Sequence, residues 1–344
     1  MSYGIAAAPG EVVTVVTETP HSPSGQRATR SPATSGLLYG IGAYGLWGLL
    51  PLYFLTLAPA GPVEIVAGRV LFSLVVCFAL IAATRAWRAL GAVFRSGRTF
   101  WALALAAALI AVNWLTYTFG VLTGHTIEAA LGYFINPLVS VLLGVLVLKE
   151  RLRPLQWTAV GIGAIAVVVL TVAYGQVPWI ALILAFSFGF YGLVKNRVGA
   201  KVDAVTSLTV ETVVLSPVAL AVMVWLGGAG TLTLFADGTA HFWLLAASGL
   251  ITAVPLLFFG AAARRLPMTT VGLLQYIAPL LQFIMATTIL GEHMAPERWI
   301  GFGIVWLALA ILTADMLLVA RRRRTSLRAA GLAAEAASAP SRAG

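Results

Sequence analysis

Ten apolar stretches of roughly 20 residues follow one another along this chain, separated by short joints. One helix needs about 20 mostly apolar residues to cross the hydrocarbon core of a bilayer. Only 10% of the residues are charged, which is too little to cover the surface of a water-soluble fold. We therefore predict an all-α integral membrane protein with ten transmembrane helices. The stretches cover residues 37–57, 63–84, 100–121, 127–148, 155–173, 178–194, 204–226, 241–263, 267–290 and 298–319.

The basic residues alternate from joint to joint. Of the 22 Lys and Arg residues, 20 lie in the two tails and in the second, fourth, sixth and eighth joints. Only Arg69 and Arg298 lie elsewhere. Because positive charge stays on the cytoplasmic side during insertion, this pattern predicts a plasma-membrane protein with both termini in the cytoplasm. It also explains the net charge of +10 without nucleic acid as a partner. We expect a disordered cytoplasmic tail over 1–35. Over 321–344 we expect a cytoplasmic tail with a basic start that is either disordered or a fraying extension of the last helix.

An internal duplication divides the chain into two five-helix repeats, residues 36–173 and 178–320. Five is an odd number, so the second repeat enters the membrane from the opposite side. Inverted repeats of this kind build many secondary transporters, with the substrate site near the middle of the bilayer. At an offset of 142 the identical pairs are Ile135/Ile277, Pro137/Pro279, Leu138/Leu280, Glu150/Glu292, Pro154/Pro296, Trp157/Trp299 and Gly161/Gly303.

Several motifs give the chain a family resemblance over about residues 36–320. The most specific is the run 128–138, EAALGYFINPL, followed by 186–194, FSFGFYGLV. Shorter matches are Asn-Trp at 113–114, Glu-Thr at 211–212 and Gln-Tyr-Ile at 275–277. On these residues the chain resembles the RarD-type branch of the EamA family, in the drug/metabolite transporter superfamily. The resemblance implies ten helices from a duplicated five-helix unit and an inner-membrane permease.

Three of the charged residues in or beside the apolar stretches are candidates for the substrate site, because a charge at the centre of a helix costs roughly 2.5–3.5 kcal/mol on insertion scales. Arg69 lies in the second stretch, Glu128 begins the fourth and Glu211 lies in the seventh. Arg69 and Glu211 are 142 residues apart, so the inverted repeats place them at mirror depths. They could face a central cavity, binding substrate charge or exchanging partners during transport. Alternatively, a static internal pair, for example Arg69 with Glu128, could fix the helix packing.

Neutral polar and aromatic residues complete the predicted substrate cavity. An aromatic lining would suit an amphipathic organic solute. Interhelical packing is the alternative for each of these side chains. Pro137 and Pro279 occupy equivalent positions inside helices, where each removes a backbone hydrogen bond and acts as a kink or a gating point. The other candidates are Asn113, Trp114, Tyr133, Asn136, Gln275 and Tyr276.

Other polar residues have structural explanations. We expect Gln282 to pack helices together, and Asp315 to reach Arg321 or nearby water. Glu150 and Glu292 directly follow apolar stretches, so we expect them to cap or anchor loops.

Three function classes were compared. A gradient-driven transporter of a small organic metabolite or drug-like solute, working by alternating access, fits the repeats and the sparse polar groups. Protons are a possible coupling ion, through Glu211 or Glu128. A membrane-embedded enzyme acting on a lipid-linked substrate is the alternative, but the acids are dispersed and the four histidines lack metal-ligand spacing. A sensor or channel is the third class, and a channel would need an oligomer or a continuous polar stripe, which the sequence does not show. We expect no enzyme activity, metal or cofactor; the one cysteine, Cys77, forms no internal disulfide.

Overall fold

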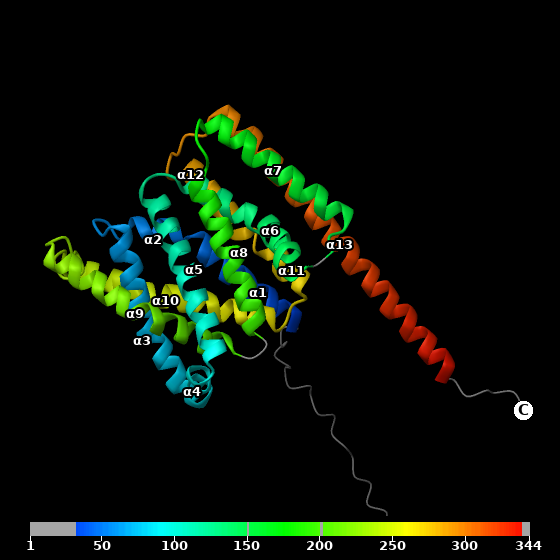
Figure 1. The fold of residues 1–344 in the computed structure, drawn as a ribbon, viewed down its shortest axis with the longest axis horizontal. Helices are drawn as coiled ribbons and strands as arrows, with labels where there is room; N and C mark the ends of the chain where they lie inside the picture. The colour runs from blue at the N-terminus through cyan, green and yellow to red at the C-terminus, as the bar shows by residue number, and fades with distance from the viewer. Residues whose placement is uncertain (1–31, 150, 200–201, 339–344) are drawn as a thin grey trace, which may run out of the picture.

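A computed structural model describes residues 32–149, 151–199 and 202–338, and the regular secondary structure of these residues is entirely helical. Ten of its segments are long and apolar enough to cross a membrane, which confirms the predicted fold class. Figure 1 shows the helices packed as one bundle, with α7 and α13 along one flank. The first repeat forms α1 (Pro32–Gly48), α2 (Leu50–Leu55), α3 (Pro62–Thr84), α4 (Trp87–Arg95), α5 (Gly97–Leu122), α6 (Thr126–Leu148) and α7 (Pro154–Tyr174).

The second repeat also has five spans. The ninth span of the chain, which lies in this repeat, consists of two helices, as does the first span. The helices of this repeat are α8 (Trp179–Gly199), α9 (Ala204–Gly228), α10 (Gly238–Ala263), α11 (Met268–Leu274), α12 (Ile277–Thr288) and α13 (Pro296–Ser338).

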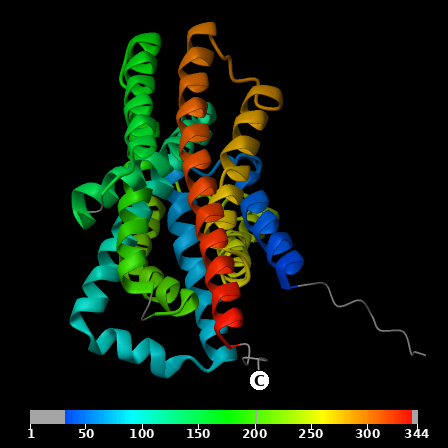
Figure 2. The ribbon, with the colours of Figure 1, turned by 90° about the vertical axis from the view of Figure 1, so that its right-hand side faces the viewer.

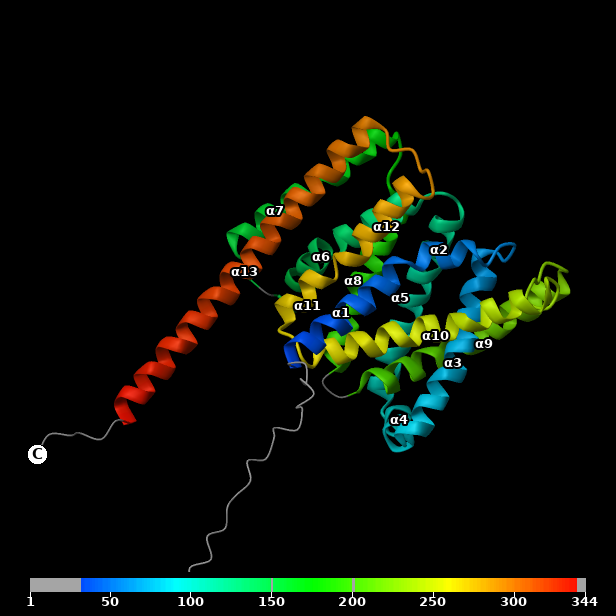
Figure 3. The same cartoon turned by 180° about the vertical axis from the view of Figure 1, so that it is seen from behind.

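Helices of one repeat pack against their equivalents in the other. The second spans of the two repeats, α3 and α9, lie against each other, as do the fourth spans α6 and α12 and the fifth spans α7 and α13. The remaining contacts come in matching sets, since α5 packs on α8 as α10 packs on α1. Figure 3 shows α7 and α13 side by side from behind. This pairing is the arrangement expected of two inverted repeats around a pseudo-two-fold axis.

Two prolines explain why the first and ninth spans are broken. A proline inside a helix lacks the amide hydrogen and crowds the carbonyl four residues earlier. Pro51 lies four residues after Trp47, and the break between α1 and α2 falls at Leu49. Pro279 likewise follows Gln275, where α11 gives way to α12. The Trp47 carbonyl instead accepts a hydrogen bond of 3.1 Å from Gln282 Nε2, so this glutamine joins α12 to α1, as its predicted packing role requires.

Close approach between helices depends on small residues at two points. A Cβ on Gly132 would lie 2.7 Å from the Ala181 carbonyl oxygen, so α6 and α8 pack backbone to backbone there. A Cβ on Gly249 would lie 2.5 Å from the Phe72 carbonyl oxygen, between α10 and α3. Small residues permit such contacts between membrane helices.

The basic joints share one end of the bundle, here called the basic end. The short helix α4, which we did not predict, lies across this end (Figure 2). It buries Leu90 and Val93 against the bundle while Trp87 and Phe94 remain exposed. Such a helix, apolar on one face with arginines beside it, is suited to the membrane interface.

Part of each tail is described, and both parts are helical. Residues 1–31 and 339–344 lie outside the described residues. Residues 32–35, which we expected to be disordered, belong to α1. Of the two possibilities for the C-terminal tail, residues 321–338 follow the helical one, because α13 continues to Ser338. That stretch contains no proline and is rich in Ala, Arg and Leu, which favour helix.

Candidate functional site

Arg69 is a buried cation inside the membrane-spanning helix α3, with 4% of its surface exposed. Its Nε donates a 2.7 Å hydrogen bond to the hydroxyl of Thr252 on α10. That hydroxyl in turn donates to the Ser248 carbonyl at 2.8 Å, so its hydrogen points away from the arginine. One face of the guanidinium lies over the Trp114 ring, 4.1 Å from the ring centroid. The side chain is therefore fixed in place by a neutral acceptor and a cation–π contact.

Tyrosines surround this cation. The phenols of Tyr53, Tyr117 and Tyr133 all interact electrostatically with Arg69. Tyr53 donates its hydroxyl to the Leu244 carbonyl at 2.7 Å. Tyr117 is 2% exposed, and its hydroxyl has no hydrogen-bond partner among the described residues.

An unbroken series of ring contacts leads from this cluster toward the basic end. The centroid separations along it run from 5.6 to 6.0 Å. Edge-to-face and tilted contacts at such distances are favourable between aromatic side chains. The rings belong, in order, to Phe54, Tyr117, Tyr133, Phe188 and Tyr191.

Asn113 joins three helices within this series. Its Oδ1 accepts a 2.9 Å hydrogen bond from the Tyr133 hydroxyl. Its Nδ2 donates to the Leu184 carbonyl at 3.2 Å and to the Ser187 hydroxyl at 3.1 Å. These bonds connect α5 to α6 and α8, and they orient the Tyr133 ring.

Glu211 lies at the other end of the ring series, on α9. Its Oε1 pairs with Lys195 Nζ at 2.6 Å and accepts from the Ser207 hydroxyl at 3.0 Å. Its Oε2 accepts from the Tyr191 hydroxyl at 3.2 Å. The carboxylate side chain is 2% exposed, whereas the lysine is 28% exposed. A buried carboxylate is thereby linked to a cation that reaches the surface.

Neither Glu211 nor Glu128, the two predicted partners, forms an ion pair with Arg69. Glu211 has Lys195 instead, and the Glu128 carboxylate accepts hydrogen bonds from the backbone amides of Ile180 and Ala181, at 2.9 and 3.4 Å. Across the described ranges 32–149, 151–199 and 202–338, no carboxylate oxygen comes within 4.0 Å of the Arg69 nitrogens. Arg69 and Glu211 thus occupy equivalent helices without touching each other.

The remaining predicted residues lie on the fourth and ninth spans, α6 and α11–α12. The Asn136 Oδ1 is buried beside Gly189 without a hydrogen-bond partner in the described chain. It precedes Pro137, and α6 remains one helix through that proline. Gln275 and Tyr276 form the junction between α11 and α12, so they lie at a real break in the transmembrane span.

Two predicted structural carboxylates contact the opposite repeat. Asp315 pairs with Arg153 rather than with Arg321; Arg153 Nε lies 2.9 and 3.0 Å from the two carboxylate oxygens. These hydrogen bonds raise the pKa of Arg153 above its ordinary value. Glu292 accepts hydrogen bonds from the first two amides of α6, as an anchoring role requires. Glu150 lies outside the described residues.

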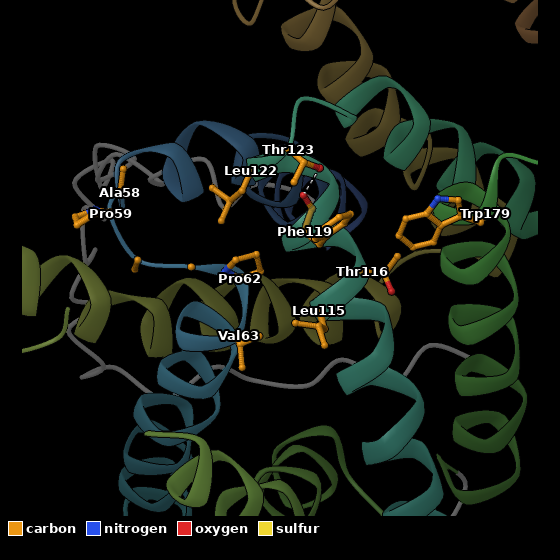
Figure 4. A pocket seen from close by; sticks show the side chains of 12 residues that line it. Ala58, Pro59, Pro62, Val63, Leu115, Thr116, Phe119, Leu122, Thr123 and Trp179 are labelled. Atoms are coloured by element: carbon orange, nitrogen blue, oxygen red, sulfur yellow. Dashed lines mark hydrogen bonds between the residues drawn. The ribbon is translucent and has the colours of Figure 1, made fainter. Parts of the chain in front are cut away.

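A separate groove of about 730 Å³ lies at the end opposite the basic joints, between α3, α5 and α8. Figure 4 shows Phe119 and Trp179 on its wall, with Pro62 and Val63 opposite. Its lining is mostly apolar, with Thr116 and Thr123 as the polar members, and it includes none of the predicted site residues.

Sequence reasoning missed Tyr53, Tyr117, Lys195 and Thr252 as parts of the site. Tyr117 could have been found, since it lies one helical turn after Asn113 and Trp114. Lys195 lies in the basic sixth joint, where its charge is already explained by membrane topology. Within the described residues no group of three or more His, Cys, Asp or Glu side chains could hold a metal.

Comparisons with known proteins agree with this architecture. The EamA-like transporter family matches two consecutive segments, residues 34–172 and 177–314. Protein RarD of Streptomyces exfoliatus is 52% identical over 296 residues, covering 86% of this chain and 93% of that protein. Uncharacterized transporters of Vibrio cholerae and Bacillus subtilis (YojE) are 41% and 39% identical, over 82% and 81% of this chain and 93% of each relative. A protein of known crystal structure is 20% identical, covers 84% of this chain and 98% of its own, and shares the fold with a TM-score of 0.54.

Proposed function

This chain belongs to the EamA-like transporter family, and from that premise we propose that it carries a small organic metabolite or drug-like solute across the plasma membrane by alternating access, driven by a gradient. Its homologues are named transporters, which supports transport over enzymatic activity. The substrate lies between the two repeats, and the basic end of the bundle faces the cytoplasm.

One observation carries the proposal: equivalent helices of the inverted repeats pack on each other, and the central pair α3 and α9 places Arg69 and Glu211 at equivalent positions. Rocking of one repeat against the other opens such a pair toward either face in turn. The arginine lies nearer the end opposite the basic joints, and the glutamate nearer the basic end.

The aromatic series supplies a surface for an organic solute between these two charges. Rings of Tyr117, Tyr133 and Phe188 offer apolar faces and polar edges along the path. The break at Gln275 and Tyr276 gives the ninth span a point at which it can bend. Asn113 and Asn136 contribute polar groups next to the same rings and to α8.

Protons are the coupling ion in this proposal, and Glu211 is the carrier. Its carboxylate is held by Lys195, Tyr191 and Ser207, so loss or gain of one proton changes an entire buried cluster. A partly exposed lysine at the basic end gives this cluster a polar connection to the cytoplasm.

The test is transport by the purified full-length chain in liposomes, with a panel of labelled metabolites and drugs. We expect accumulation of at least one solute against its gradient, and loss of that flux in Arg69→Ala or Glu211→Gln. If both variants transport as the parent does, the site assignment is wrong. Conversion of a lipid-linked substrate without solute flux would replace the transporter with the membrane-enzyme alternative.

A further inference from the structure

We propose that Arg69 and Tyr117 form a binding site for a carboxylate, so that the solute is an organic monoanion. This inference rests on the proposed transport function and names the chemical class of the solute at the same site.

In the described part of the chain, the buried charges inside the bundle are not all balanced by protein groups. Buried charges in proteins are normally paired or fully hydrogen-bonded. Here Glu211 has Lys195 and Asp315 has Arg153, whereas Glu64 and Glu128 accept from backbone amides. In the same described part of the chain, Arg69 has no carboxylate within ion-pairing distance. The resting protein therefore holds one buried positive charge that a ligand can balance.

The Arg69 guanidinium has N–H donors that the described part of the protein leaves unused. A guanidinium has five N–H donors arranged as a fork, and two parallel donors match the two oxygens of a carboxylate. Arg69 uses its Nε on Thr252 and one face on Trp114. Within the described residues its two terminal nitrogens donate to no protein acceptor. The contacts thus fix the plane of the guanidinium and leave free the edge that would hold a carboxylate.

Tyr117 is a second buried group near Arg69 that lacks a partner in the described part of the chain. The Tyr117 hydroxyl is buried and lacks a hydrogen-bond partner among the described residues, which is costly for a polar group. The Tyr117 phenol interacts electrostatically with Arg69. The centroid of its ring lies 5.6 Å from that of Tyr133. A carboxylate bound by Arg69 would supply the acceptor that this hydroxyl lacks.

The surroundings favour an organic acid over an inorganic anion. Tyr117 packs on Phe54 and Tyr133, and the Trp114 ring covers the guanidinium. These groups provide apolar contact for the carbon skeleton of the solute. Chloride shares the negative charge but gains nothing from such contact.

The experiment measures ligand-induced thermal stabilisation of the detergent-solubilised full-length chain. The probes are a size series of monocarboxylic acids, from acetate through benzoate to phenylbutyrate, each compared with its neutral amide; sodium chloride is a separate arm. We expect at least one aromatic acid to raise the melting temperature when its amide does not. No stabilisation by any acid, equal stabilisation by acid and amide, or equal stabilisation by chloride would overturn the carboxylate assignment.

Two variants separate binding from folding. Arg69→Gln removes the charge, and we expect it to weaken binding of the acid by about tenfold or more. Tyr117→Phe removes one hydroxyl and keeps the ring. We expect it to weaken binding of the acid by about tenfold and to leave the fold unchanged. The matched control is Tyr44→Phe, because Tyr44 is a buried tyrosine that contacts Trp47 and Phe259 instead. Equal acid binding by Tyr117→Phe and Tyr44→Phe would contradict the role of Tyr117.

Flux in liposomes distinguishes this inference from the function on which it rests. Uptake of neutral or cationic solutes that survives Arg69→Gln would keep the transporter and reject the carboxylate site. Acid binding that depends on Arg69, without flux of any acid, would keep the site and reject transport.

Discussion

The carboxylate of Glu292 accepts a hydrogen bond of 2.6 Å from the backbone amide of Thr126, the first residue of α6, and another of 2.8 Å from Ile127. A loop of the second repeat thereby caps a helix of the first, at the end opposite the basic joints. The first amides of a helix lack intrahelical acceptors and favour a negative charge. This contact holds the two repeats together at that end.

Glu292→Gln tests this contact. The glutamine keeps one oxygen acceptor but loses the charge, so we expect the free energy of unfolding to fall by about 1–2 kcal/mol. The measurement is equilibrium unfolding of the purified chain in mixed detergent micelles. His293→Gln, at the neighbouring exposed position, should be close to neutral. Equal effects of the two substitutions would assign Glu292 no capping role.

The Arg153–Asp315 pair connects α13 to the start of α7. Asp315 is 4% exposed and Arg153 is 45% exposed, so part of the interaction is screened by solvent. A double-mutant cycle with Arg153→Gln and Asp315→Asn should give a coupling energy on the order of 1 kcal/mol. Additive single effects would show that the two side chains do not interact in solution.

Asp203 caps α9, accepting hydrogen bonds from the amide and the hydroxyl of Thr206. Partial burial acts to raise the pKa of Asp203, but the hydrogen bonds from Thr206, together with those from the backbone amides of Val205 and Asp203, outweigh it, and the pKa lies below its ordinary value. The stabilisation is therefore present above the unfolded-state pKa of about 3.9 and is lost as pH falls through the folded pKa.

Two substitutions check this cap. Asp203→Ala should cost about 1 kcal/mol at neutral pH, whereas Asp203→Asn keeps a capping oxygen but cannot titrate. Melting temperatures between pH 3 and pH 7 should therefore fall less steeply for Asp203→Asn than for the parent. Asp237→Asn is a comparison for loss of a carboxylate without loss of a cap, since Asp237 precedes α10 with no side-chain capping bond and lies 3.8 Å from His241 Nδ1. Parallel pH profiles for Asp203→Asn and the parent would contradict the assignment.

Lys195 and Glu211 should behave as one unit. Glu211→Gln alone leaves a lysine without its carboxylate, so we expect reduced stability, and Lys195→Met with Glu211→Gln should recover it.

For proton coupling, Glu211→Gln should abolish uptake driven by an imposed pH gradient while exchange of labelled for unlabelled solute continues. Gradient-driven uptake by Glu211→Gln would remove Glu211 from the coupling mechanism.

The inverted topology places the fourth and ninth joints on opposite sides of the membrane. In a Cys77→Ser background, a cysteine replacing exposed His293 should react with an impermeant maleimide added outside intact cells. A cysteine replacing exposed Lys149 should react only after the membrane is opened. Labelling of both positions from outside would refute the inverted arrangement.

Sequence alone determined the ten spans, because a segment's hydropathy decides whether it partitions into the bilayer. It also determined the two repeats, because the identities between them can be counted without a structure. It also located Arg69, Glu211 and the aromatic residues as unusual groups inside apolar helices. The sequence marked Pro137 and Pro279 as equivalent points of interruption, but only Pro279 breaks its span, since α6 continues through Pro137.

Only the tertiary structure decided which groups meet. Arg69 donates a hydrogen bond to Thr252, 183 residues away in the sequence. Arg153 and Asp315 are 162 residues apart, and Glu292 and Thr126 are 166 residues apart. Nearly every helix here is apolar on most sides, so hydropathy does not specify its rotation about its own axis. Packing between helices sets that rotation. It gave Glu211 a lysine as its partner and left Arg69 without a carboxylate among the described residues.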